Sequence, residues 1–87
     1  MANYGKTDNY IIQELGFRIK SLRKEKGLSQ AALTELTGLN RISISKMENG
    51  ENFTIHSLIK VMRALNCLDD IDLLFAKKDD DLHKLFE

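Results

Sequence analysis

The same tripeptide pattern, a glycine, a leucine and a helix-capping residue, occurs twice in this sequence and predicts short helices. Gly27-Leu28-Ser29 and Gly38-Leu39-Asn40 each place a glycine two residues before a side chain suited to cap the next helix. Glycine ends helices because it adopts the left-handed conformation without strain, and serine or asparagine begins them by accepting a hydrogen bond from a free backbone N–H. The chain between these two tripeptides therefore has room for only one short helix, which we expect to end near Thr37.

The remaining chain carries apolar residues at the spacing of an α-helix. Ile12, Leu15 and Ile19 recur every three or four positions, as on the buried stripe of an amphipathic helix. Asn40 and Thr54 cap two later segments with the same spacing, and no segment has the alternation and turns of strands. The expected helices are residues 11–26, 30–37, 41–49, 55–65 and 69–75. We therefore expect an all-α fold, a bundle of five helices.

The length of 87 residues allows one hydrophobic core and therefore one domain. Residues 1–10 are polar without periodicity, and we predict a flexible N-terminal arm there. Residues 11–75 hold the five expected helices. Residues 76–87 begin with a charge run and end with apolar residues. We expect this C-terminal tail to make a dimer or partner contact.

Residue usage argues against several classes of function. Cys67 is the single cysteine, and His56 and His83 lack a nearby cysteine or second histidine at metal-ligand spacing. Because no nucleophile and base can be paired from these residues, we expect no enzyme, no metal site and no cofactor. No apolar run approaches the ~18 residues of a membrane span, and the polar N-terminus is no signal peptide. We expect a cytoplasmic protein.

Residues 29–49 carry the functional signal. Two short helices flank a tight turn, with Leu33 on the first and Ile44 and Met47 on the second directed at a shared core. This spacing is typical of a helix-turn-helix unit, whose second helix lies in the DNA major groove. The other face of that helix is polar or cationic apart from one isoleucine. It consists of Arg41, Ile42, Ser45, Lys46 and Asn49.

The motifs around this unit resemble a known family. Residues 27–30 (GLSQ), 37–40 (TGLN) and 47–50 (MENG) occur at the spacing of the Cro/cI-type (XRE) helix-turn-helix domain of phage repressors and bacterial regulators. The resemblance covers about residues 13–68. It implies a lambda-repressor-like bundle of five helices, in which the second and third helices bind DNA.

The resemblance also implies roles for individual residues. Gln30 would contact a phosphate and support the third helix, and Arg23 would pair with Glu48 to hold that helix in place. Thr34 departs from the family pattern, which has a small alanine where the two helices come closest. The implied base contacts are Arg41, Ile42, Ser45 and Lys46. The implied phosphate contacts or caps are Asn40, Ser43 and Asn49.

The charge distribution supports a polyanionic partner. Thirteen basic and thirteen acidic residues give a net charge of zero, so global charge alone predicts nothing about nucleic acid. The basic residues, however, are in excess between Leu15 and Gly50, and the acidic ones are in excess after Phe53. A protein with one basic face suits double-stranded DNA. Arg41 could bind guanine through two hydrogen bonds, and Ile42 could contact a thymine methyl group.

These features together predict a DNA-binding transcription regulator, most simply a repressor. Apolar residues after Leu65 are too numerous for a monomer's surface, so we expect a homodimer on a palindromic operator. The segment ALNCLDDIDLLF, residues 64–75, resembles the HipB-like antitoxins, which implies a HipA-like kinase toxin as a further partner. The alternative function is a protein-interaction module that keeps the helix-turn-helix scaffold without binding DNA.

Overall fold

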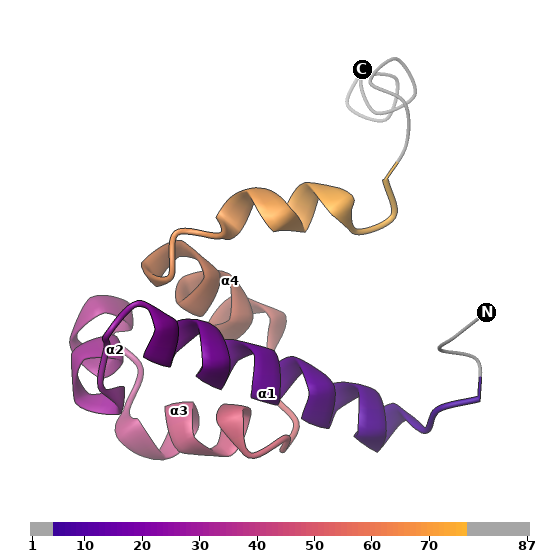
Figure 1. The fold of residues 1–87 in the computed structure, drawn as a ribbon, viewed down its shortest axis with the longest axis horizontal. Helices are drawn as coiled ribbons and strands as arrows, with labels where there is room; N and C mark the ends of the chain where they lie inside the picture. Colours follow the sequence, from indigo (N-terminus) through magenta and orange to yellow (C-terminus); the bar gives the residue numbers. More distant parts are fainter. Residues whose placement is uncertain (1–4, 77–87) are drawn as a thin grey trace.

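Four α-helices and one 3-10 helix follow one another in the computed structural model, which describes residues 5–76 (Figure 1). They are α1 (Asp8–Glu25), α2 (Gln30–Thr37), α3 (Arg41–Glu48), α4 (Ile55–Ala64) and η1 (Leu68–Leu73). All regular structure in this part of the chain is helical, which confirms the predicted all-α class.

The N-caps predicted from the sequence are formed. Ser29, Asn40 and Thr54 are extended, and each side-chain oxygen accepts a hydrogen bond from the backbone N–H three residues later. Gly38 ends α2 with φ 76°, in the left-handed region where a side chain would be strained. The turn between α2 and α3 is therefore fixed locally, by a glycine on one side and the Asn40 cap on the other.

Helix α1 begins three residues before the predicted start at residue 11. Thr7 is its N-cap and accepts a hydrogen bond from the Tyr10 N–H at 3.1 Å. Asp8 lies in the first turn, where a negative charge is stabilised by the helix dipole. Residues 8–10 thus belong to the helix rather than to the predicted arm, because the helix starts at the Thr7 cap, before the apolar periodicity begins.

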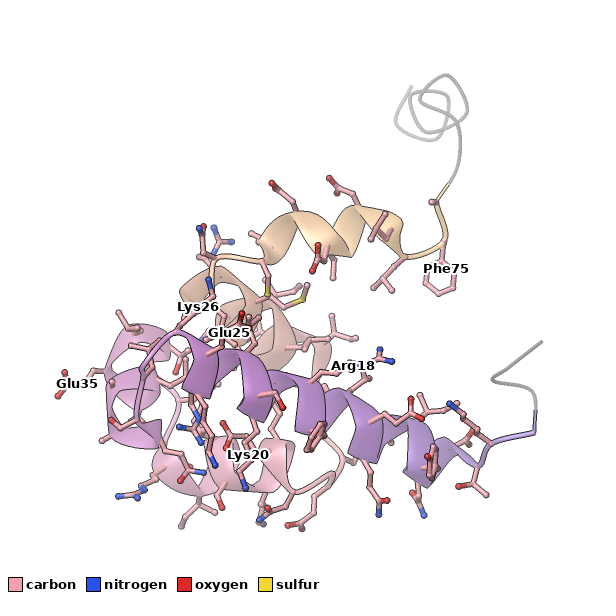
Figure 2. All side chains as sticks on the ribbon, viewed as in Figure 1. Arg18, Lys20, Glu25, Lys26, Glu35 and Phe75 are labelled. Atoms are coloured by element: carbon pink, nitrogen blue, oxygen red, sulfur yellow. The ribbon has the colours of Figure 1, made fainter. Side chains whose placement is uncertain are left out.

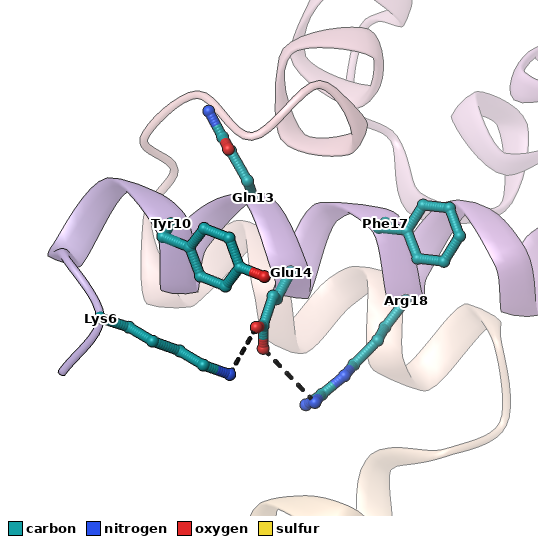
Figure 3. Close-up of a pocket in the computed structure, with 6 residues that line it drawn as sticks. All are labelled: Lys6, Tyr10, Gln13, Glu14, Phe17 and Arg18. Atoms are coloured by element: carbon teal, nitrogen blue, oxygen red, sulfur yellow. Dashed lines mark hydrogen bonds and ion pairs between the residues drawn. The ribbon is translucent and has the colours of Figure 1, made fainter. Parts of the chain in front are cut away.

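An ion-pair chain fastens this first part of α1 (Figure 3). Lys6 Nζ lies 2.7 Å from Glu14 Oε1 and 5.3 Å from the centre of the Tyr10 ring. Arg18 approaches the other oxygen of Glu14 at 3.7 Å. The hydrogen bond from Lys6 lowers the pKa of the Glu14 carboxyl. These contacts cross the predicted boundary between arm and domain.

The core lies where α1, α2, α3 and α4 meet. Its fully buried side chains are Leu33, Ile44, Met47, Val61 and Leu65. In Figure 1, α3 lies on one side of α1, and α4 and η1 lie on the other. The outward face of α3 is therefore remote from the C-terminal end of the domain.

The fifth helix is a 3-10 helix, and it leaves apolar residues in solvent. No side-chain hydrogen bond caps its start, and the chain turns at Phe75, where φ is 53°. Leu73, Leu74 and Phe75 are 74%, 55% and 95% exposed. The tail predicted as a partner contact continues from here, and residues 77–87 lie outside the described part of the chain.

Gly16 explains how α1 and α3 come close together. It is buried in the middle of α1, and a β-carbon at this position would clash with the carbonyl oxygen of Met47 and lie 2.9 Å from that of Glu48. Glycine normally weakens a helix interior by about 1 kcal/mol relative to alanine. Here it allows the α1 backbone to touch the end of α3.

We expect Gly16→Ala to destabilise the protein by about 1–3 kcal/mol, because the backbone of α1 or α3 must shift to accept the methyl group. Urea unfolding followed by circular dichroism measures this change. Gly5→Ala is the matched control, since nothing lies within 4 Å of its β-carbon position. A Gly16→Ala protein that gained stability, as helix propensity alone predicts, would contradict the close approach.

Candidate nucleic-acid interface

The turn between α2 and α3 is built around a buried threonine. Thr37 Oγ1 donates to the Leu33 carbonyl at 2.7 Å and accepts from the Leu39 N–H at 3.1 Å. Both hydrogen-bonding functions of this hydroxyl are used, so its burial is compensated. Thr37 thus stabilises the turn at Gly38 through two side-chain hydrogen bonds.

Thr34 has no such compensation. Its Oγ1 is buried, and within residues 5–76 it has no hydrogen-bond partner. An unpaired buried hydroxyl destabilises a protein by about 1–3 kcal/mol. The departure from the family's alanine at this position therefore has a physical consequence, although the turn itself is formed.

The outward face of α3 carries the residues predicted to contact bases. Arg41, Ile42 and Lys46 are exposed, and Ser45 is half-buried beside them. Ile42 is 68% exposed. The inward side of α3 presents Ile44 to the core instead. An apolar group among hydrogen-bonding ones is the composition that suits base edges in the major groove.

Gln30 connects this face to the interior. Its Nε2 donates to Glu48 Oε1 at 3.1 Å, and its Oε1 accepts from Arg41 Nε at 3.4 Å. Both ends of the amide therefore have partners in the protein. In this arrangement Gln30 links Glu48 to Arg41 at the start of α3, and these two contacts leave one N–H of the amide unused.

Apart from Gln30 on α2, the residues predicted to contact phosphates lie toward the two ends of α3. Asn40 Oδ1 accepts from the Ser43 N–H at 2.7 Å, so these two residues meet at the N-terminus of the helix. Asn49 is exposed at the C-cap position. A helix N-terminus attracts phosphate because its free N–H groups and its dipole favour negative charge.

Arg23 and Glu48 form a buried ion pair that joins α1 to α3. Arg23 Nε lies 2.6 Å from Glu48 Oε2, and Arg23 Nη2 lies 3.0 Å from Oε1. The two side chains are only 8% and 1% exposed. Arg23 Nη1 also donates to the Leu28 carbonyl at 2.8 Å. This geometry fixes the guanidinium against three acceptor oxygens.

The pair shifts the pKa of both partners. The hydrogen bond to Glu48 raises the pKa of Arg23. Burial by itself would raise the pKa of Glu48, but the hydrogen bonds from Arg23 and Gln30 outweigh it and lower that pKa below its usual range. Glu48 is therefore ionised at neutral pH in the interior, where loss of Arg23 would leave a negative charge unpaired.

Lys20 is a residue of this region that the sequence did not single out. It is half-buried and extends from α1 toward α3 (Figure 2), and its charge helps to lower the pKa of Glu48. Residues three apart share a helix face. The spacing of Lys20 from Arg23 could therefore have predicted that both side chains lie on the side of α1 that faces α3. Lys20 adds a positive charge close to the last turn of α3.

Among residues 5–76, no group of three or more histidine, cysteine, aspartate or glutamate side chains is placed to hold a metal ion. In the same range, no helix is both long enough and apolar enough to cross a membrane. The candidate site is the surface formed by the predicted residues on and around α3.

Comparison with known proteins identifies the family of the chain. The family model described as Helix-turn-helix matches residues 19–70, more than half of the chain. A search of curated proteins finds none that matches. The matched range includes α2, the turn and α3, with the buried pair that fixes them. The chain therefore belongs to the XRE-type helix-turn-helix family of DNA-binding transcription regulators.

Proposed function

We propose that this protein is a cytoplasmic transcriptional repressor that binds a palindromic operator as a homodimer. The observation that carries the proposal is the exposed polar face of α3, supported from behind by the Gln30, Glu48 and Arg23 hydrogen bonds. A helix in a major groove must present an outward face of fixed orientation, because base contacts depend on side-chain position.

Within this proposal the DNA-contacting side chains on and around α3 divide into two groups. Arg41 contacts guanine, and Ile42, Ser45 and Lys46 contact the neighbouring base edges. The other group holds the helix on the DNA backbone and contacts phosphates. It consists of Gln30, Asn40, Ser43 and Asn49, to which we add Lys20 because of its position beside α3.

A selection of bound sequences from a random DNA pool tests the proposal. We expect two inverted half-sites whose centres are about 34 Å apart, roughly one turn of the double helix. Recovery of a single half-site would contradict the dimer but keep the DNA-binding surface. No enrichment at any salt concentration would favour the alternative, an interaction module on the same scaffold.

The proposed dimer contact is the exposed apolar end of η1. Leu73 and Phe75 are 74% and 95% exposed, and neighbouring apolar residues in solvent commonly mark a protein contact. The same end of η1 would serve a kinase toxin if the protein is also an antitoxin. Copurification of the two products from a shared operon would separate that role from simple repression.

We expect Phe75→Asp to shift the protein from dimer to monomer, with at least a tenfold weaker dimerisation constant (about 1.4 kcal/mol), because the charge would be buried at the contact. Sedimentation equilibrium measures this constant. Ile55→Asp is the matched control, since Ile55 is 64% exposed at the start of another helix. A Phe75→Asp protein that remained as tight a dimer as the control would place the interface elsewhere.

A further inference from the structure

An apolar groove of about 280 Å³ runs between α1, α4 and η1. Two of the elements that line it, α4 and η1, lie on the opposite side of α1 from α3 (Figure 1). Its lining includes Leu22 of α1, Leu58 and Met62 of α4, and Cys67 and Leu74 at the two ends of η1. Among all the lining side chains, only Arg18 and Asp70 are charged. Three helices of the described chain line this groove, and none of their side chains fills it.

We propose that the groove binds the chain's own C-terminal segment, residues 77–87, through Leu82, Leu85 and Phe86. The described chain ends at residue 76, two positions after Leu74, which itself lines the groove. Six residues span at most about 20 Å when extended. Leu82 can therefore return to the groove after the turn at Phe75, where φ is 53°.

The sequence of the segment matches an apolar groove. Leu82, Leu85 and Phe86 are separated by three and one positions, and the residues between and after them are His83, Lys84 and Glu87. Residues at this spacing share one face of a helical turn. One turn would thus place three apolar side chains against the groove and leave the polar ones in solvent.

One of the two charged residues that line the groove, Arg18, is placed to attract the acidic part of the segment. Arg18 lines the groove with a side chain that is 73% exposed, and its contact with Glu14 is 3.7 Å long. The segment carries three consecutive acidic residues, 79–81, immediately before Leu82. An acidic run that approaches the groove past Arg18 would be attracted to it, and the contact would weaken with added salt.

The tether favours this occupant over a second copy of the protein. A segment joined to the groove by a few residues has an effective concentration in the millimolar range, which a separate molecule does not reach in dilute solution. Leu73 and Phe75 do not line the groove. Binding of the segment in the groove therefore does not require the dimer contact or DNA binding, and each of the three can be tested separately.

Cys67 provides a test in the full-length chain. It is the single cysteine, it is half-buried, and it lines the groove. The rate at which Ellman's reagent modifies it, relative to the rate in denaturant, therefore reports how often the groove is open. We expect Leu82→Ser/Phe86→Ser to raise the native rate about tenfold, since the reagent reacts only with the open fraction. His83→Ser/Glu87→Ser is the matched control and should leave the rate unchanged.

Dilution separates the occupants. Protection by the tethered segment is independent of protein concentration, whereas protection by a second copy disappears as the protein is diluted. Circular dichroism checks that all variants keep the helical fold. Equal rates in the wild type and in Leu82→Ser/Phe86→Ser would overturn the proposal. Protection that disappears on dilution would overturn it in favour of a second copy.

Discussion

Arg23→Ala is expected to lower the free energy of unfolding by about 3–5 kcal/mol, the usual effect of removing one partner from a buried ion pair. The Glu48 carboxylate would remain almost fully buried, with Gln30 as its remaining side-chain partner. Native proteins are stable by about 5–15 kcal/mol, so this loss would be a large fraction of the total stability. Urea unfolding at neutral pH measures the loss.

Two further variants test whether the stability lost in Arg23→Ala comes from the Arg23–Glu48 ion pair. Lys24→Ala changes an exposed neighbour on α1 and should alter stability by no more than about 0.5 kcal/mol. Arg23→Ala/Glu48→Ala removes the unpaired charge and should recover part of the stability. If the losses of the two single variants simply added in the double variant, the two side chains would not be coupled.

DNA affinity is expected to fall by about 10³-fold or more between 50 and 200 mM salt, if a dimer neutralises six or more phosphates. Cations released from the DNA backbone drive this dependence, and the basic residues of α1 and α3 are the groups that would displace them. Fluorescence anisotropy with a labelled duplex, repeated at several salt concentrations, gives the slope of log affinity against log salt.

The position of the basic face can be tested in the same assay. Lys20→Ala should reduce the salt slope by about one for each phosphate that Lys20 neutralises, because this side chain extends toward α3. Arg63→Ala is the control: Arg63 is an exposed cation in the last turn of α4, and its removal should leave the slope unchanged. A slope that dropped equally in both variants would mean that DNA binding is not confined to the α3 side.

Local signals made most of the fold predictable. Capping side chains such as Ser29, Asn40 and Thr54 act within four residues of themselves, so their effect is visible in sequence. Gly38 is similar, because its left-handed conformation is a local requirement of the turn. The start of α1 was misplaced because the Thr7 cap precedes the apolar repeat and lies among polar residues.

Features that depend on distant contacts could not be predicted from composition or spacing. Helix propensity alone counts Gly16 as unfavourable in α1, and only the approach of the Met47 and Glu48 carbonyls gives the reason for it. The Arg23–Glu48 pair followed from a family resemblance, and its near-complete burial required the packed structure. The double contact of Gln30 depends on where α2 and α3 place three side chains, which no sequence pattern specifies.

Selection of DNA sequence by α3 through Arg41 can be measured on the operator itself. Affinities of the wild type and of Arg41→Ala are compared across every single-base variant of the selected operator, with Asn49→Ala as the control for a phosphate contact. We expect Arg41→Ala to weaken operator binding by about 1–3 kcal/mol and to remove the preference at one base position in each half-site. Asn49→Ala should weaken all sequences by a similar factor. If Arg41→Ala instead weakened every operator variant equally, Arg41 would be a phosphate contact and α3 would not select sequence through it.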